Sequence, residues 1–297
     1  MTTSAGPAPL TRRPGLGFAM ALSGGVLFGI SGTVAAGLFS SFSPAELNQY
    51  RLVLAAAFIS LIAARKGLMH HGGRFGLLVL QGVITAAITF AFFVAVERLG
   101  VGPGITIQYM GPILMLVWRR LVQRQHVPVA GWMGAVAAVV GIGLITGAFT
   151  ADYADPIGVA AGLAAAVFYA ALTITAEKLG KTLHPLTYSS YSLTVAAVIW
   201  LAVLPVKIPQ LSIAGWLGVV WVSIIAMGLG YLLLMSALRH ISPGPTGVAA
   251  TSEPIVGTLT AWVALSQTLS MVETTGVALT AVGIAVVHWS IRRTPGF

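Results

Sequence analysis

The chain of 297 residues is 57% hydrophobic and only 8% charged, and it contains no cysteine. A soluble domain carries about 25% charged residues, so this chain lacks the polar residues that a water-facing surface needs, and a soluble fold is excluded. The missing cysteines exclude disulfides, thiolate nucleophiles and cysteine-ligated metals. The meaning of the net charge of +9 depends on where the charged residues lie in the chain.

Ten apolar segments are long enough to cross a hydrocarbon core about 30 Å thick as helices of roughly 20 residues. In chain order they are 17–39, 45–64, 75–96, 101–122, 128–149, 156–178, 185–204, 212–237, 243–266 and 272–291. None shows the strict alternation of apolar and polar residues that a barrel strand requires. We therefore expect an all-α membrane protein with ten transmembrane helices.

The basic residues predict how these helices are oriented. With the N-terminus inside, thirteen of the sixteen Lys and Arg residues fall in inner segments, Arg98 and Lys207 in outer loops, and Arg51 within a span. Because cytoplasmic loops are enriched in Lys and Arg, both tails, 1–16 and 292–297, are expected in the cytoplasm and the chain in the plasma membrane, which in a bacterium is the inner membrane. Contact with the anionic lipid bilayer accounts for the +9, so no nucleic-acid partner is expected. A monomer is compatible with the sequence.

The two halves of the chain align with each other. A shift of 141 residues superposes Gly17 on Gly158, Pro44 on Pro185 and Tyr50 on Tyr191, and a shift of 142 superposes Pro103 on Pro245, Pro112 on Pro254, and Gly134 and Gly141 on Gly276 and Gly283. This predicts two five-helix repeats, 17–149 and 156–291. Because five is odd, the repeats enter the membrane in opposite senses, an inverted topology that secondary transporters use to open a central site to either side. The alternative is that duplication only built a stable bundle.

The ten spans, the inverted repeat and the Asn48-x-x-Arg51 pair resemble the drug/metabolite transporter superfamily, EamA type. Two stretches resemble its signature helices, Gly102-Pro103-Gly104…Gly111-Pro112 and Gly244-Pro245…Glu253-Pro254. The resemblance covers almost the whole chain and is greatest to the YddG-type exporters of aromatic and other apolar amino acids. It implies a transporter of small metabolites, and the direction of export rests on this resemblance alone.

Paired spans interrupted by Gly and Pro are the best indication in a sequence of a transporter binding site. Here they are Val101–Pro112 and Pro243–Pro254. Proline lacks a backbone donor and glycine loosens the turn, so such helices can bend; the alternative is that small residues only allow close packing. The candidate breaks or hinges are Gly102, Pro103, Gly111, Pro112, Pro243, Gly244, Pro245 and Pro254.

Two charged residues lie within spans, where each costs about 3 kcal/mol to insert. Arg51 lies about 9 Å along the second helix and Glu253 about 15 Å along the ninth, and their counterparts in the other half, Ser192 and Gly111, are uncharged. Three functional interpretations remain open: the two charges bind each other, Arg51 holds a substrate carboxylate, or Glu253 binds a substrate ammonium or a proton. The alternative is that Arg51 extends outward to the interface and Glu253 caps a broken helix.

Polar and aromatic residues inside other spans complete the candidate substrate pathway. Thr246, Ala250 and Glu253 share one helix face, and Gln81, Thr85 and Thr89 form a similar stripe on the third helix. The full set of candidates is Tyr50, Arg51, Gln81, Gln108, Tyr109, Tyr169, Tyr191, Trp221, Thr246, Ala250 and Glu253.

No motif indicates catalysis. The sequence has no HExxH, Walker or G-x-S-x-G pattern, so we expect no enzyme, no catalytic residue, no metal and no cofactor. The leading hypothesis is a secondary transporter that exports a small-molecule substrate, an aromatic or apolar amino acid, by alternating access; a strongly anionic solute would need more cations than Arg51. The alternatives are an exporter of lipophilic cations or drugs, a passive channel and a membrane-embedded enzyme.

Overall fold

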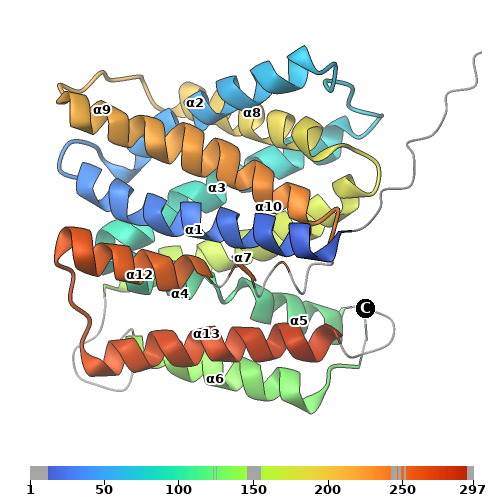
Figure 1. The fold of residues 1–297 in the computed structure, drawn as a ribbon, viewed down its shortest axis with the longest axis vertical. Coiled ribbons are helices and arrows are strands. Elements are labelled where there is room, and N and C mark those ends of the chain that lie inside the picture. The colour runs from blue at the N-terminus through green and yellow to red at the C-terminus, as the bar shows by residue number, and fades with distance from the viewer. Residues whose placement is uncertain are drawn as a thin grey trace, which may run out of the picture.

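A computed structural model describes residues 13–122, 124, 126–145, 155–241, 246, 249–250 and 252–292, and all the regular elements in them are helices (Figure 1). In chain order they are α1 (Pro14–Leu38), α2 (Pro44–Arg65), α3 (Phe75–Leu99), α4 (Val101–Gln108), α5 (Gly111–Leu121), α6 (Val129–Ile145), α7 (Pro156–Gly180), α8 (Pro185–Val203), α9 (Ile213–Val220), η1 (Trp221–Gly230), α10 (Tyr231–Ala237), α12 (Ser252–Leu265) and α13 (Met271–Arg292).

Within the described residues the helices follow the ten predicted spans, and two of these spans are not a single α-helix. The span 101–122 is divided into α4 and α5, and the span 212–237 contains a π-helical turn region, η1, between α9 and α10. Six helical stretches are long and apolar enough to cross a membrane, namely α1, α2, α3, α7, α8 and Ile213–Ala237, and shorter apolar helices occur in α6, α12 and α13. The chain is therefore a helical membrane protein.

Local capping residues fix where several helices begin. Ser43 and Glu46 form a capping box at the start of α2, and the Asp155 carboxylate accepts hydrogen bonds from the backbone of Ile157 and Gly158 at the start of α7. At α8 the cap is His184, whose Nδ1 accepts from the Leu186 N–H at 3.2 Å. A proline follows each of these caps, where its missing N–H has no helical partner to lose.

Helices α2 and α8 run antiparallel along each other. The Tyr50 hydroxyl in α2 donates to the Lys207 carbonyl beyond the end of α8 at 2.6 Å, and the Tyr191 hydroxyl in α8 donates to the Met69 carbonyl beyond the end of α2 at 2.7 Å. Each helix thus begins beside the end of the other, and the two ends are tied in the same way.

Helices α6 and α13 also lie side by side (Figure 1) and cross through small residues. A Cβ on Gly283 would come within 2.5 Å of the Gly134 carbonyl, and one on Gly141 within 2.6 Å of the Gly276 carbonyl. Glycine therefore allows the two backbones to approach closely, as is common between membrane helices.

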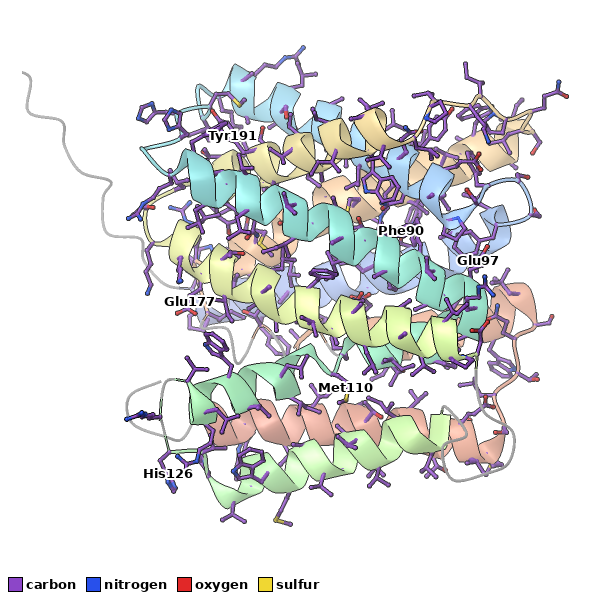
Figure 2. All side chains as sticks on the ribbon, turned by 180° about the vertical axis from the view of Figure 1, so that it is seen from behind. Phe90, Glu97, Met110, His126, Glu177 and Tyr191 are labelled. Carbon is purple, nitrogen blue, oxygen red and sulfur yellow. The ribbon has the colours of Figure 1, made fainter. Side chains whose placement is uncertain are left out.

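Apolar side chains cover much of the outside of the bundle. Large exposed residues such as Val136 on α6, Val167 on α7 and Leu217 on α9 have 55–64% of their surface exposed. Figure 2 shows the acidic Glu97 and Glu177 at opposite ends of the helices. An apolar flank between charged ends suits a surface that contacts lipid.

Candidate functional site

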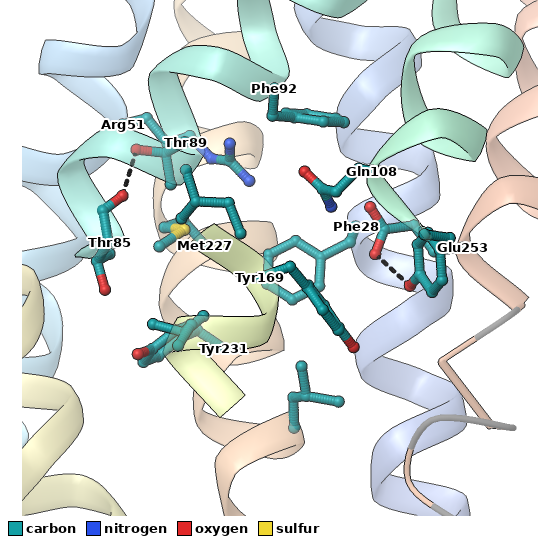
Figure 3. Close-up of a pocket in the computed structure, with 14 residues that line it drawn as sticks. Phe28, Arg51, Thr85, Thr89, Phe92, Gln108, Tyr169, Met227, Tyr231 and Glu253 are labelled. Atoms are coloured by element: carbon teal, nitrogen blue, oxygen red, sulfur yellow. Dashed lines mark hydrogen bonds between the residues drawn. The ribbon is translucent and has the colours of Figure 1, made fainter. Parts of the chain in front are cut away.

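The halves of the chain meet at a cavity of about 70 Å³. Figure 3 shows its lining, which comes from α1, α2, α3, α7, η1, α10, α12 and the α4–α5 junction. The lining residues are Phe28, Arg51, Thr85, Ile88, Thr89, Phe92, Gln108, Tyr109, Tyr169, Leu172, Met227, Tyr231, Leu234 and Glu253. Both charged residues predicted to lie within spans are among them.

Arg51 is buried, with 3% of its surface exposed. Its guanidinium carbon lies 4.8 Å from the ring centre of Phe93 and 5.9 Å from those of Phe28 and Phe92, so π faces provide part of its electrostatic environment. Its Nε has no hydrogen-bond partner among the described residues. The side chain therefore does not extend to the interface.

An ion pair between Arg51 and Glu253, one of the three interpretations that the sequence leaves open, is not formed in the part of the chain that the structure describes. In the view of Figure 3 the two side chains approach the cavity from opposite sides. Glu253 is 7% exposed and its Oε2 lies 2.8 Å from the Tyr109 hydroxyl. The cavity thus has a cationic end and a carboxyl end.

The junction between α4 and α5 brings Tyr109 to the cavity. Pro112 lacks the N–H that would continue the helix, and the chain turns at Tyr109 and Met110 before α5 starts at Gly111. Figure 2 shows Met110 at this junction. A Cβ on Gly111 would come within 2.6 Å of Tyr169, so glycine is required for the Tyr169 ring to lie 5.8 Å from that of Tyr109.

The other predicted hinge residues are placed as follows. Gly102 and Pro103 lie in the first turn of α4, after Gly100. They therefore mark the beginning of that helix and do not interrupt it. Pro254 is in the first turn of α12, and Pro243, Gly244 and Pro245 lie outside the described residues.

Several predicted pathway residues lie beside the cavity without lining it. Gln81 is fully buried and its amide donates to the Tyr231 hydroxyl at 3.3 Å, so it supports a lining residue. Ala250 accepts a hydrogen bond from Tyr109 through its carbonyl. Tyr50 and Tyr191 bind loop carbonyls, Trp221 packs in a hydrophobic cluster at the start of η1, and Thr246 is buried.

Sequence reasoning missed the apolar part of the lining, including Phe28, Phe92 and Met227, although the repeat contains a signal for it. Under the same shifts of 141 and 142 residues, eight lining residues form four equivalent pairs: Phe28 with Tyr169, Thr85 with Met227, Thr89 with Tyr231, and Phe92 with Leu234. Equivalent positions of the two halves therefore face the same cavity.

The chain is similar in sequence to a known protein family and to individual transporters. The profile of the EamA-like transporter family matches the chain twice, over residues 15–147 and 156–289. The chain is 24% identical over 272 residues to the uncharacterized transporter YwfM of Bacillus subtilis, and the alignment covers 90% of this chain and 91% of that protein. It is 22% identical over 210 residues to the uncharacterized transporter sll1319 of Synechocystis, covering 66% and 61%.

A solved crystal structure of a protein with 17% identity has a TM-score of 0.67 to this chain and covers 93% of this chain and 98% of the other. At this identity the likeness shows a shared fold.

Proposed function

Because the chain belongs to the EamA-like transporter family, we propose that it is a secondary transporter that exports aromatic and other apolar amino acids across the bacterial inner membrane. Export would proceed by alternating access, with the cavity between the repeats opened first to the cytoplasm and then to the outside. The observation that carries the proposal is a buried Arg51 cation, without a protein anion bonded to it among the described residues, at one end of an aromatic cavity.

Two helix pairs support an inverted repeat. Exchanging the halves converts the Tyr50–Lys207 contact of α2 and α8 into the Tyr191–Met69 contact, within three residues of the alignment. The same exchange converts the contact between Gly283 and Gly134 into the one between Gly141 and Gly276. Since each pair consists of equivalent helices that run antiparallel, the halves are expected to have opposite topology.

The cavity chemistry suits a zwitterion with an apolar side chain. A guanidinium binds a carboxylate through paired, charge-assisted hydrogen bonds, and Arg51 has a buried donor without a partner among the described residues. Glu253, on the other side, suits an ammonium group. Phe28, Phe92 and Tyr169 line the space between them and suit an aromatic side chain.

An exporter of lipophilic cations is the alternative in the same fold, with Glu253 as counter-ion and the rings providing cation–π contacts. The buried positive charge of Arg51 in the same cavity opposes a cationic ligand. A passive channel would need a continuous polar lining, and an enzyme would need an acid–base pair at membrane depth.

The proposal is tested by substrate counterflow in proteoliposomes. Phenylalanine loaded inside should drive saturable accumulation of labelled phenylalanine, whereas tetraphenylphosphonium should not. Accumulation of the cation alone would overturn the amino-acid assignment.

Opposite topology is tested with single cysteines, since the natural chain has none. Ser41 and Thr182 occupy equivalent exposed positions, one before α2 and one before α8. With an impermeant maleimide on intact cells, Ser41→Cys should be labelled and Thr182→Cys should not. Labelling of both from the same side would exclude inverted repeats.

A further inference from the structure

Three buried polar side chains lie one helical turn away from the cavity. Ser31, Asn48 and Ser223 have 0% of their surface exposed. Within the part of the chain that the structure describes, neither serine hydroxyl and neither polar atom of the Asn48 amide has a hydrogen-bond partner. Buried polar groups are normally hydrogen-bonded, and an unpaired one costs free energy. These three residues, here called the polar layer, are therefore suited to binding a ligand.

Each residue of the polar layer is three or four positions along its helix from a residue that lines the cavity. The pairs are Ser31 with Phe28 in α1, Asn48 with Arg51 in α2, and Ser223 with Met227 in η1. Residues at this spacing share a helix face, and the wider turns of η1 keep it close to one turn. The polar layer therefore continues the faces that form the cavity.

Helix α1 packs against η1 and runs antiparallel to the stretch from α9 to α10 that contains it. A Cβ on Gly24 would lie 3.1 Å from the carbonyl oxygen of Gly230, at the end of η1. A Cβ on Gly218, before η1, would lie 3.4 Å from Leu38 at the end of α1. A forward step along α1 therefore leads the same way as a backward step along η1.

Helix α2 also packs against η1 and runs parallel to the same stretch. The rings of Tyr50 and Trp216 are 6.0 Å apart. Further along both segments, a Cβ on Gly228 would lie 3.1 Å from Phe58. Backward steps along α2 and η1 thus lead the same way as the forward step along α1, so the polar layer lies on one side of the cavity, next to Arg51.

The charge beside the polar layer is positive. The Arg51 guanidinium lies against neutral aromatic rings, with Phe93 nearest at 4.8 Å, and its Nε has no hydrogen-bond partner among the described residues. The carboxyl group of Glu253 is bonded to Tyr109 instead. Hydroxyl, amide and guanidinium groups can all donate hydrogen bonds, and a buried cation is stabilised by a counter-charge. Donors grouped beside an unpaired cation suit an anion.

We propose that the polar layer and Arg51 form a binding site for one small monovalent anion, either a halide ion or the carboxylate group of the transported amino acid. The anion accepts hydrogen bonds from Ser31, Asn48 and Ser223 and neutralises the charge of Arg51. The halide part is independent of the function proposed above, whereas the carboxylate part rests on it.

The site is tested with bromide as the probe, by thermal unfolding of the purified full-length protein in detergent at constant ionic strength. A ligand of the folded state raises the unfolding temperature, so bromide should raise it to a plateau in the wild type. Ser223→Ala should increase the bromide concentration for half of this rise about tenfold, because a hydrogen bond to a charged group is lost. No rise in the wild type, or the same half-saturation in Ser223→Ala, would overturn the proposal.

Ser189→Ala is the matched control. Ser189 is equally buried and its Oγ also lacks a partner among the described residues, but it lies in α8, from which no described residue lines the cavity. Its bromide response should equal that of the wild type.

Asn48→Asp separates an anion site from a packing role. The aspartate carboxylate has the shape of the amide and supplies the negative charge itself, so this variant should be at least as stable as the wild type without bromide and should gain nothing from it. A bromide response of wild-type size in Asn48→Asp would contradict the anion site.

Competition distinguishes the two sources of the anion. Excess phenylalanine should increase the half-saturating bromide concentration, whereas phenethylamine, which lacks the carboxylate, should not. Bromide binding without this competition would overturn the carboxylate part and leave the halide site. Phenylalanine counterflow by a protein that bromide does not stabilise would overturn the anion site and leave the proposed function intact. Bromide stabilisation without phenylalanine counterflow would overturn the amino-acid function and leave the anion site intact.

Discussion

The helix crossings and the cavity differ in how far the two halves remain alike. At the α6–α13 crossing the same glycines face each other in both directions, and at α2–α8 a tyrosine ties each end. In the cavity, equivalent positions carry different side chains: Arg51 against Ser192, Glu253 against Gly111, and Phe28 against Tyr169. The crossings only have to pack, which both halves can do alike, whereas a ligand with two different ends needs a different group at each end.

The largest effect on transport is expected from substitution of Arg51, which has no charged counterpart in the other half of the chain. Arg51→Gln should lower phenylalanine transport by about 10- to 100-fold, because a charge-assisted hydrogen bond contributes about 1.5–3 kcal/mol and each 1.4 kcal/mol is about tenfold. Arg51→Lys should retain part of the activity, since it keeps the charge without the planar fork. Ser192→Ala, at the equivalent position, should change transport by less than about threefold. Initial rates of counterflow measure all three, and equal losses for Arg51→Gln and Ser192→Ala would show that the position matters only for packing.

The α6–α13 crossing should lose a similar amount of stability when a glycine of either helix is substituted. Gly141→Ala and Gly283→Ala each place a Cβ within 2.6 Å or less of the partner helix, so each should cost about 1–3 kcal/mol of stability through overpacking. Gly15→Ala is the control, since nothing lies within 4 Å of its added Cβ. Thermal unfolding in detergent should show two similar losses and none for the control. A loss in only one of the pair would mean that the crossing is not equivalent from its two sides.

The sequence predicts the positions of the helices better than the residues of the cavity, because helices have a recognisable sequence pattern and most cavity residues do not. Helix positions follow from apolar length, and Pro44, Pro156 and Pro185 mark the helix starts closely. Arg51 and Glu253 stand out because a charge in a span is costly.

The cavity residues Phe28, Phe92 and Met227 do not stand out, since an apolar side chain suits lipid, core and cavity equally. Two further features depend on packing between helices, which no single segment encodes. They are the hydrogen bonds of Tyr50 and Tyr191 to loop carbonyls and the π-helical turns of η1.

The two tyrosine contacts offer a sharper test of the comparison. Tyr50→Phe and Tyr191→Phe each remove one hydroxyl-to-carbonyl hydrogen bond, worth about 0.5–1.5 kcal/mol. Stability should fall by similar amounts, but the two contacts lie at opposite ends of the α2–α8 pair, so the variants should shift access to the cavity in opposite directions. Labelling of Leu172→Cys, a cavity residue, by an impermeant reagent from outside should rise in Tyr50→Phe and fall in Tyr191→Phe, by about two- to tenfold. Changes in the same direction would contradict a separate role for each end.

The smallest effect concerns the caps of these same helices, where Ser43 and His184 are equivalent positions with different chemistry. Partial desolvation lowers the pKa of His184, and the nearby Arg239 and Lys66 lower it further. The neutral ring accepts the Leu186 N–H, so the unfolded chain binds a proton more readily than the folded one. The contribution of His184 is therefore complete above its unfolded pKa of about 6.5 and is lost as the pH falls through the folded pKa.

Unfolding temperature measured from pH 8 to pH 5 should accordingly fall less steeply in His184→Asn, which keeps a cap that does not titrate. Ser43→Ala should lower stability by about 1 kcal/mol while keeping the wild-type dependence on pH, because the serine hydroxyl does not titrate in this range. An unchanged slope in His184→Asn would mean that the histidine cap is not the group that distinguishes the two helix starts. A steeper fall in Ser43→Ala would assign the pH dependence to α2 instead, where Glu46 completes the capping box.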